Sequence, residues 1–245
     1  MRAVILGATR GMGRSLAREL ALRGDQIVIL GRDPEELARS ARDLEVRGAS
    51  GEVHTIGCDL TQPETFAAAL DEAQERLDGF DLVVVTAGIF ATQDELEADR
   101  ELTRELLTVD FANTVVFCEE ARTRLLARGG GTLCVFSSVA GDRGRKPVIL
   151  YGAAKAGLSA YLEGLDHKFR SRGLRTVCVK PGFVKTGMTA GLKPPPFAGE
   201  PDAVARTVLK AIARGKPVVY APPIWALVMA VIRALPRFLM RRINF

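Results

Sequence analysis

The sequence is poor in the residues from which metal centres and disulfide frameworks are built. Among its 245 residues there are only four cysteines and two histidines. The cysteines are far apart and form no CxxC pair: Cys58, Cys118, Cys134 and Cys178. This spacing predicts neither a zinc site nor a set of disulfides. We therefore expect reduced thiols, a cytoplasmic setting and no bound metal.

Long hydrophobic runs are also missing. The apolar run Ala3–Leu6 is too short for the core of a secretory signal and leads directly into glycines. The eleven uncharged residues 222–232 are too few for a bilayer span, which needs about twenty. With 47% hydrophobic and 26% charged residues, the composition is that of an ordinary globular protein.

Acidic residues are nearly absent from the C-terminal segment. Residues 201–245 contain eight basic residues and one acid, Asp202, so this segment carries +7 and the rest of the +5 chain carries −2. Charge confined to one end indicates a local partner. Nucleic acid is not expected as that partner, because the basic residues have no aromatic residues interleaved with them.

Short apolar runs alternate with segments of helical period along the whole chain. This alternation predicts a single α/β domain, a doubly wound parallel sheet with helices on both faces. The expected strands are Ala3–Leu6, Gln26–Leu30, Gly51–Ile56, Leu82–Thr86, Thr132–Phe136, Arg175–Val179 and Pro217–Tyr220. The expected helices are 12–23, 34–47, 63–77, 99–127, 149–171 and 201–214. We place the domain at 1–221, with a lid at 182–200 and a C-terminal tail at 222–245.

A glycine-rich loop follows the first expected strand. It allows a sharp turn and a close approach of the backbone to a pyrophosphate, and the next helix offers its N-terminal N–H groups. A GxxxGxG pattern becomes informative when it stands between a strand and a helix. The loop predicts a dinucleotide site formed by Gly7, Thr9, Arg10, Gly11, Met12 and Gly13.

The end of the second expected strand bears on the choice of cofactor. Enzymes that use NAD usually place an acid there for the ribose 2′-hydroxyl. This chain has Arg32 there instead, and Arg10 lies in the glycine loop. Two guanidinium groups favour a 2′-phosphate, so NADP(H) is the expected cofactor. The alternative is that both arginines are merely exposed charges.

Three side chains suggest acid–base chemistry. Tyr151 and Lys155 are four residues apart in an expected helix and share a face. An ammonium beside a phenol lowers the phenol pKa from about 10, and the phenol then gives a proton to a carbonyl oxygen as hydride reaches the carbon. Ser138, thirteen residues upstream of the tyrosine, is placed to polarise the same oxygen.

The chain resembles the short-chain dehydrogenase/reductase family over essentially its whole length. The resemblance rests on the glycine loop, Ser138 and Tyr151–Lys155, together with Cys58-Asp59-Leu60, Thr86-Ala87-Gly88 and Pro181-Gly182. The resemblance implies that Asp59 and Leu60 border the adenine and that Ala87 and Gly88 lie beside the cofactor. It also implies that Tyr151 and Lys155 contact the nicotinamide half, Lys155 through the ribose. Pro181 and Gly182 would flank the nicotinamide, and Thr186 in Val184-Lys185-Thr186 would contact its amide.

One position departs from the family pattern. The family usually has an asparagine where this chain reads Val109-Asp110-Phe111, and that asparagine helps hold a water that relays protons to the lysine. We assign Asp110 to this place, where its charge would alter the relay. Asn113, three residues on, is the weaker candidate for the missing group.

Two segments bear on the substrate. The loop between Ser138 and Tyr151 carries Arg143, Arg145 and Lys146, which either bind a phosphate-bearing substrate or form a solvated loop. The tail combines an apolar stretch with Arg233, Arg237 and Arg241, interrupted by Pro236. Such a tail fits either an anchor on anionic lipid or an apolar interface between subunits.

The second half of the chain, 151–245, is also similar to the reductases that form decaprenylphosphoryl arabinose. That resemblance implies reduction, by a nicotinamide cofactor, of a 2-keto sugar on a polyprenyl phosphate. Two other functions stay open: a reductase or dehydrogenase of a soluble or acyl ketone, and a non-catalytic, nucleotide-sensing scaffold recruited to membranes. The family resemblance further implies a homo-oligomer formed through helices 99–127 and 149–171.

Overall fold

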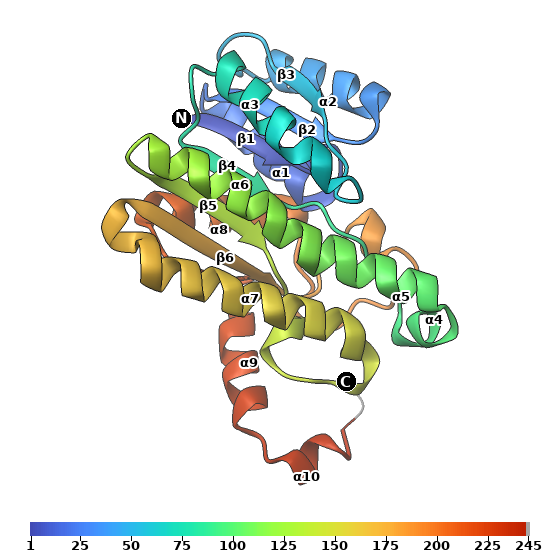
Figure 1. Cartoon of the computed structure of the whole chain (residues 1–245). Coiled ribbons are helices and arrows are strands. Elements are labelled where there is room, and N and C mark those ends of the chain that lie inside the picture. Colours follow the sequence, from blue (N-terminus) through green and yellow to red (C-terminus); the bar gives the residue numbers. More distant parts are fainter. Residues whose placement is uncertain (244–245) are drawn as a thin grey trace.

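The computed structural model describes residues 1–243, which form one parallel sheet with helices on both faces (Figure 1). The sheet has seven strands in the order β3-β2-β1-β4-β5-β6-β7. Their bounds are β1 (Arg2–Leu6), β2 (Gln26–Gly31), β3 (His54–Gly57), β4 (Leu82–Val85), β5 (Gly131–Phe136), β6 (Leu174–Pro181) and β7 (Val218–Ala221). The predicted single α/β domain with a doubly wound parallel sheet is confirmed.

Residues 1–243 also contain ten α-helices and several single turns, of which α9 and α10 follow the last strand. The α-helices are α1 (Gly11–Leu22), α2 (Pro34–Val46), α3 (Phe66–Arg76), α4 (Gln93–Ala98), α5 (Arg100–Leu107), α6 (Thr114–Ala127), α7 (Ile149–Phe169), α8 (Pro201–Arg214), α9 (Ile224–Ala234) and α10 (Arg237–Met240). The 3-10 turns are η1 (Pro63–Thr65), η3 (Val139–Asp142), η4 (Lys146–Val148), η5 (Arg170–Arg172) and η6 (Gly187–Thr189). A π-helical segment, η2 (Thr108–Asn113), joins α5 to α6.

The two faces of the sheet bury separate apolar cores. On one face α3, α6 and α7 pack, and Phe66 meets Phe117 edge to face with ring centroids 5.5 Å apart. On the other face α1, α2 and α8 pack through residues such as Leu16 and Val208. Both cores need strands that are apolar on each side, and every residue of β4 is buried.

The chain reverses direction across the sheet between β1 and β4. From β1 it builds outward to β3 and then returns to place β4 on the other side of β1. Crossovers on opposite sides leave a crevice at the carboxyl ends of these two strands, where open α/β sheets bind their ligands. The glycine loop directly follows β1 and therefore lies in this crevice.

Three predicted elements differ in detail. The third strand begins at His54 rather than Gly51, because Gly51 adopts a φ of +78°, which belongs to a turn. The predicted helix 99–127 contains the π-helical segment η2. The predicted helix 63–77 starts with the 3-10 turn η1, so its α-helical part begins only at Phe66.

The tail forms α9 and α10, which extend from the body of the molecule (Figure 1). As predicted, the helix breaks near Pro236: α9 ends at Ala234, and Leu235 is extended. One face of α9 packs Trp225, Met229 and Ile232 against Val139 of η3 and against neighbouring apolar side chains. Within residues 1–243, no helix has the length and apolar character needed to cross a membrane.

Candidate active site

The glycine loop makes a close turn between β1 and α1. Gly7 has a φ of +97°, and a Cβ on Gly13 would lie 2.2 Å from the Gly7 carbonyl oxygen. Arg10, which precedes the helix, is extended and caps none of the first-turn N–H groups with its side chain. The loop therefore offers backbone donors and the positive end of α1 in a cradle that only glycines can form. These residues fit the pyrophosphate of a dinucleotide.

Arg10 and Arg32 lie exposed beside this cradle. Within the described part of the chain, neither forms an ion pair with an acidic side chain. The nearest acid in sequence, Asp33, caps α2 by accepting bonds of 3.1 Å from the Glu35 and Glu36 N–H groups. Its carboxylate is thereby engaged, while the two guanidinium groups remain available to an anion.

The carboxyl ends of β3 and β4 border the same crevice. Asp59 accepts a 2.9 Å bond from the Thr61 N–H, and the Leu60 carbonyl accepts a 2.6 Å bond from the Asn113 amide. Thr86, directly before Ala87 and Gly88, donates its hydroxyl to the Gly7 carbonyl at 2.9 Å. This last bond ties the end of β4 to the glycine loop.

Ser138, Tyr151 and Lys155 meet at the carboxyl end of β5. Ser138 follows this strand, and its side chain lies beside that of Tyr151, whose pKa it lowers. Tyr151 and Lys155 lie in the first two turns of α7, and the Lys155 Nζ is 5.5 Å from the centroid of the Tyr151 ring. The structure therefore brings together the three side chains that the sequence suggests for acid–base chemistry.

Asp110 lies on the other side of Lys155. The distance between its Oδ2 and the Lys155 Nζ is 3.1 Å, and its Oδ1 accepts a 2.7 Å bond from the Ile89 N–H. The side chains of the pair are 0% and 6% exposed. Asn113 points instead to the Leu60 carbonyl. Of the two candidates from the sequence, Asp110 is thus the one that contacts the lysine.

This charge pair changes the expected titration of Tyr151. Burial raises the tyrosine pKa, Lys155 lowers it and Asp110 raises it, so that the pKa lies above its ordinary value. The pKa of Lys155 is also raised, because Asp110 and the tyrosine outweigh the opposite effect of burial. The expectation that the ammonium brings the phenol toward the working pH is therefore wrong for this structure. It considered neither the burial of the phenol, which is the largest cause of the raised pKa, nor the carboxylate beside the lysine.

Several residues that position the site have no recognisable sequence signal. Gln93, at the start of α4, accepts bonds of 2.8 and 3.2 Å from the Ile149 and Leu150 N–H groups and so caps α7. Phe90 packs edge to face on the Tyr151 ring, with centroids 5.2 Å apart. The Ser137 hydroxyl donates to the Lys155 carbonyl at 2.9 Å. Only the fold brings these side chains to α7.

The basic loop after Ser138 is partly used to hold the tail. Arg143 donates to the carbonyls of Arg233 and Leu235 at 3.2 and 2.9 Å, at the end of α9. Arg143 is therefore committed to the protein backbone, which differs from both alternatives for this loop, a phosphate site and a solvated loop. Burial lowers the pKa of the partly buried Arg145. Lys146 is exposed.

The segment 182–200 also contacts the tail. The Trp225 indole N–H donates to the Phe197 carbonyl at 3.4 Å, and a Cβ on Gly182 would lie 2.1 Å from the indole nitrogen. Val184 pairs with Gly199 in a short bridge that closes the base of the segment. Near the start of the segment, Thr186 faces the glycine loop, since a Cβ on Gly11 would lie 3.3 Å from the Thr186 methyl carbon. The segment 182–200 thus lies between the glycine loop and α9.

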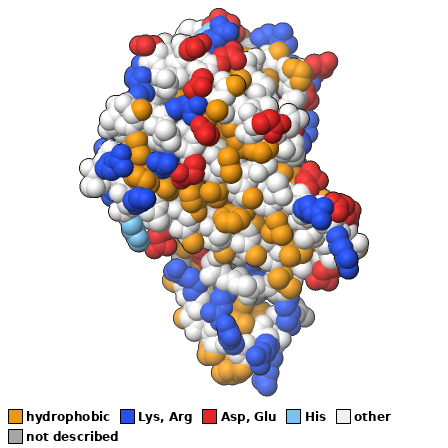
Figure 2. Space-filling view, viewed as in Figure 1, with side chains coloured by type: hydrophobic (Ala, Val, Ile, Leu, Met, Phe, Trp, Pro, Cys, Tyr) orange, Lys and Arg blue, Asp and Glu red, His pale blue; other side chains and the backbone are white. Residues whose placement is uncertain are grey.

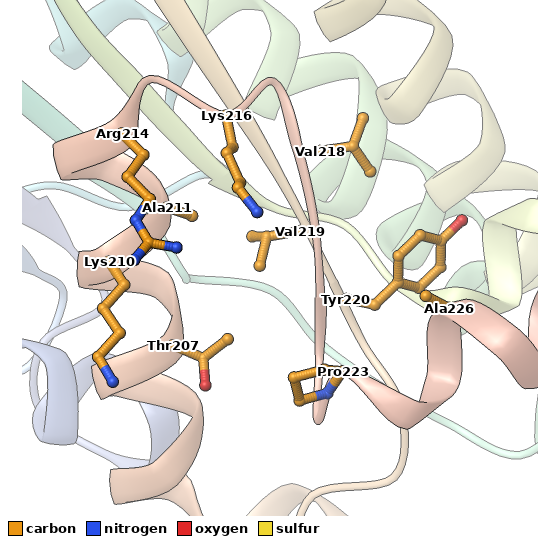
Figure 3. A pocket seen from close by; sticks show the side chains of 10 residues that line it. All are labelled: Thr207, Lys210, Ala211, Arg214, Lys216, Val218, Val219, Tyr220, Pro223 and Ala226. Atoms are coloured by element: carbon orange, nitrogen blue, oxygen red, sulfur yellow. The ribbon is translucent and has the colours of Figure 1, made fainter.

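A separate cavity of about 420 Å³ lies between α8, β7 and α9 (Figure 3). Lys210, Arg214 and Lys216 line one side, and Val219, Tyr220 and Pro223 line the other. It contains none of the residues that meet around Tyr151. It therefore contributes positive charge to this end of the molecule but is not the site of the acid–base chemistry.

Comparisons with known proteins agree with this geometry. The family described as short chain dehydrogenase matches residues 1–196. The chain belongs to the short-chain dehydrogenase/reductase family. An uncharacterised oxidoreductase of Mycobacterium tuberculosis is 34% identical over 241 residues, which cover 98% of this chain and 95% of the relative.

Two further relatives illustrate the breadth of the short-chain dehydrogenase/reductase family. Carbonyl reductase family member 4 of Danio rerio is 31% identical over 216 residues, covering 84% of this chain and 89% of that protein. A short-chain type dehydrogenase/reductase structure from Mycobacterium ulcerans has a TM-score of 0.80 at 22% identity, covering 89% of this chain and 86% of the other. The latter likeness shows the fold. The chain is thus an oxidoreductase of a family that uses nicotinamide cofactors.

Proposed function

We propose that this chain is an NADP(H)-dependent reductase that converts a ketone into an alcohol. The observation that carries the proposal is the meeting of Ser138, Tyr151 and Lys155 at the end of the crevice that holds the glycine loop. The reduced nicotinamide supplies a hydride when the cofactor is bound. The Ser138 hydroxyl holds the carbonyl oxygen, and Tyr151 donates its hydroxyl proton to that oxygen. Solvent returns the proton to the tyrosine.

The preference for NADP(H) rests on Arg10 and Arg32. Both are exposed beside the glycine loop, and the nearby Asp33 is engaged as the cap of α2. Guanidinium groups bind a phosphate with charge-assisted hydrogen bonds, whereas a free carboxylate at this place would repel it. Lys155, one helical turn beyond Tyr151, would hold the nicotinamide ribose in this proposal.

The substrate that best matches the surface is a ketone on an anionic lipid, such as the 2-keto sugar of a polyprenyl phosphate. The free face of the tail exposes Leu227 and Val231, which are 65% and 56% exposed, and Phe238, which is 59% exposed. Arg143 connects the end of α9 to the loop that follows Ser138. A tail that rests on a lipid surface would therefore hold the active site near a lipid-linked substrate.

The test is NADPH oxidation with a polyprenyl-phosphoryl 2-keto-pentose in detergent, measured beside a short soluble ketone. We expect rapid turnover of the lipid and little of the soluble compound. Turnover of the soluble ketone alone would remove the lipid substrate and leave the reductase. Absence of turnover with both, in protein that binds NADPH, would favour a nucleotide-sensing scaffold.

A reductase of soluble or acyl ketones is the second candidate. It is favoured by the likeness to the carbonyl reductase of Danio rerio. The same assay separates the two, because a soluble ketone needs no lipid surface. Self-association through α6 and α7 is part of either proposal, since Phe111, Val116 and Ile149 are exposed apolar residues on these two helices or at the π-helical entry to α6.

A further inference from the structure

The lysine of the site shares its buried position with a carboxylate. The Lys155 Nζ lies 3.1 Å from the Asp110 Oδ2, and the two side chains are 6% and 0% exposed. A buried charge pair of this kind persists only when both partners are held in place, because desolvation of each charge is costly. The structure shows how both are held.

Asp110 is presented by the π-helical segment η2. Such segments insert a residue into an otherwise α-helical run and redirect the side chains there. The Ile89 N–H fixes the Asp110 Oδ1 at 2.7 Å. Gly88 permits this approach, since a Cβ on it would lie 2.9 Å from the same oxygen. On the other side, the Lys155 carbonyl accepts bonds of 2.9 Å from the Ser137 and Ser159 hydroxyls.

The pair determines the charge that Tyr151 experiences. The charges that act on the phenol are those of Lys155, from its own helix α7, and of Asp110, from η2, while Ser138 after β5 contributes a hydrogen bond. Cys178 on β6 also acts on Lys155. Burial raises the pKa of that thiol, so it is neutral near pH 7. An isolated ammonium stabilises phenolate, but an ammonium paired with a carboxylate presents almost no net charge.

We propose that Asp110 is a positioning residue that neutralises Lys155 and thereby keeps Tyr151 a protonated phenol at neutral pH. A phenol donates a proton, which carbonyl reduction requires, whereas alcohol oxidation requires a phenolate to accept one. The pair therefore extends to higher pH the range over which Tyr151 can act as a proton donor. This inference deepens the proposed reductase function and rests on it. Asp110 acts through Lys155 and touches neither substrate nor cofactor in this scheme.

The first test compares pH profiles of kcat/KM for the wild-type protein and for Asp110→Asn. In reduction, activity is lost as pH rises through the tyrosine pKa, because the phenol loses the proton that it must donate. Removing the carboxylate leaves Lys155 unpaired, so we expect this alkaline limb to move down by about one pH unit or more. In alcohol oxidation, activity appears as pH rises through the same pKa, so this limb should move down by the same amount. Unchanged limbs in both directions would overturn the proposal.

Asp25→Asn is the matched control. Asp25 is also a buried carboxylate beside cationic groups, but its partners are the N-terminal amine and Arg23, at the opposite end of the sheet from the site. Its removal should leave the pH profiles where they are. A shift of the same size in this variant would show that loss of any buried carboxylate produces the effect, and would contradict the assignment to Asp110.

A second readout needs neither turnover nor a folded Asp110 variant. The chain has only three tyrosines, so tyrosinate absorbance near 295 nm can be assigned by subtracting Tyr151→Phe. Burial and hydrogen bonds to carboxylates raise the pKa values of Tyr161 and Tyr220. These two tyrosines therefore do not contribute to the absorbance change near the ordinary tyrosine pKa. We expect the pKa of Tyr151 in the wild-type protein to lie above the ordinary value of a tyrosine. Titration of Tyr151 below about pH 9 in the free wild-type protein would overturn the proposal.

The two proposals fail in different ways. The reductase function fails when Tyr151→Phe retains full turnover, or when no carbonyl is reduced. The role of Asp110 fails when the tyrosine titrates in the same way with and without this carboxylate, even though the enzyme reduces its substrate.

Discussion

Two lysine–carboxylate pairs lie at this end of the sheet, one buried and one half-buried, and their surroundings give them different consequences. Asp110 and Lys155 adjoin Tyr151 and alter its protonation. Asp142 and Lys180, 2.6 Å apart, adjoin Tyr220, whose hydroxyl donates to Asp142 at 2.7 Å. The second pair ties the loop after Ser138 to β6 and β7. At the scale of the residue, the first pair thus affects the protonation of Tyr151, and the second holds the loop after Ser138 against β6 and β7.

Tyr151→Phe is the most direct test of the chemistry. The variant keeps the ring that packs on Phe90 but loses the proton donor, so turnover should fall by about a thousand-fold or more. NADPH affinity, measured by calorimetry, should stay within about two-fold, since the substitution leaves untouched the glycine loop that we propose holds the pyrophosphate. Tyr161→Phe is the matched control, because Tyr161 bonds Glu119 away from the site. Equal losses in the two variants would contradict the role of Tyr151.

Arg32→Asp tests the choice of cofactor. Loss of a guanidinium contact to a 2′-phosphate should weaken NADPH binding by about 10- to 100-fold, the equivalent of one hydrogen bond to a charged group. NADH binding should stay equal or improve, because the new carboxylate can accept bonds from the ribose hydroxyls. Arg42→Asp, an exposed arginine on the neighbouring α2, serves as the control for net charge. The same loss for NADH and NADPH would contradict a role in 2′-phosphate recognition.

At the scale of the element, α7 depends on a cap from a distant part of the chain. Its own N-cap residue, Val148, makes no side-chain cap bond. Gln93 supplies the acceptor for the Ile149 and Leu150 N–H groups, directly before the turn that carries Tyr151. The short helix α4 therefore sets the start of the helix on which the reacting side chains lie.

Gln93→Leu should show this dependence. The Ile149 and Leu150 N–H groups lose their acceptor, so the free energy of unfolding should fall by about 1 kcal/mol, within the range for loss of a helix cap. The first turn of α7 should fray, and kcat should fall more than the affinity for NADPH. Gln93→Glu retains an acceptor oxygen for these N–H groups but loses the bond that Gln93 donates to Glu97 at 2.8 Å, so it should restore part of the activity. Chemical denaturation and steady-state kinetics measure the two effects, and wild-type kcat in Gln93→Leu would contradict the assignment.

At the scale of the whole molecule, positive and apolar surface gathers at the end formed by α9 and α10. Figure 2 shows basic and hydrophobic side chains together on this projection, whereas both signs of charge are mixed over the body. Within the described residues, Arg233, Arg237, Arg241 and Arg242 form no ion pairs with acidic side chains. The last acid of the chain is Asp202. This combination suits contact with anionic lipid.

Vesicle co-sedimentation tests this contact. Arg237→Gln together with Arg241→Gln should weaken binding to vesicles that contain anionic phospholipid by roughly 30-fold, at about 1 kcal/mol for each arginine. Lys210→Gln with Arg214→Gln removes the same charge from the cavity beside α8 and is the matched control (Figure 3). Equal losses in both double variants would indicate a response to net charge alone. If the wild-type chain does not bind these vesicles, the exposed apolar face of the tail is instead assigned to an interface with a second subunit.

Much of the fold could be predicted because its signals are local. The apolar runs of the seven strands, the glycines after β1 and the tyrosine and lysine one turn apart each depend on neighbouring residues and on backbone geometry. The break in the tail is likewise local, since proline lacks the N–H that a helix needs. Even so, the predicted start of β3 at Gly51 is wrong. Gly51 adopts a turn conformation, although the stretch around it has the sequence pattern of a strand.

The electrostatics and the fastening of the site depend instead on contacts between residues far apart in the chain. Asp110 meets Lys155, Gln93 caps α7, and Arg143 binds the end of α9 only after the sheet has assembled. A sequence pattern shows which residues can carry charge or donate a hydrogen bond. The partner of each is chosen by packing, which therefore decides that the lysine is paired, that the tyrosine stays a phenol and that a basic loop holds the tail.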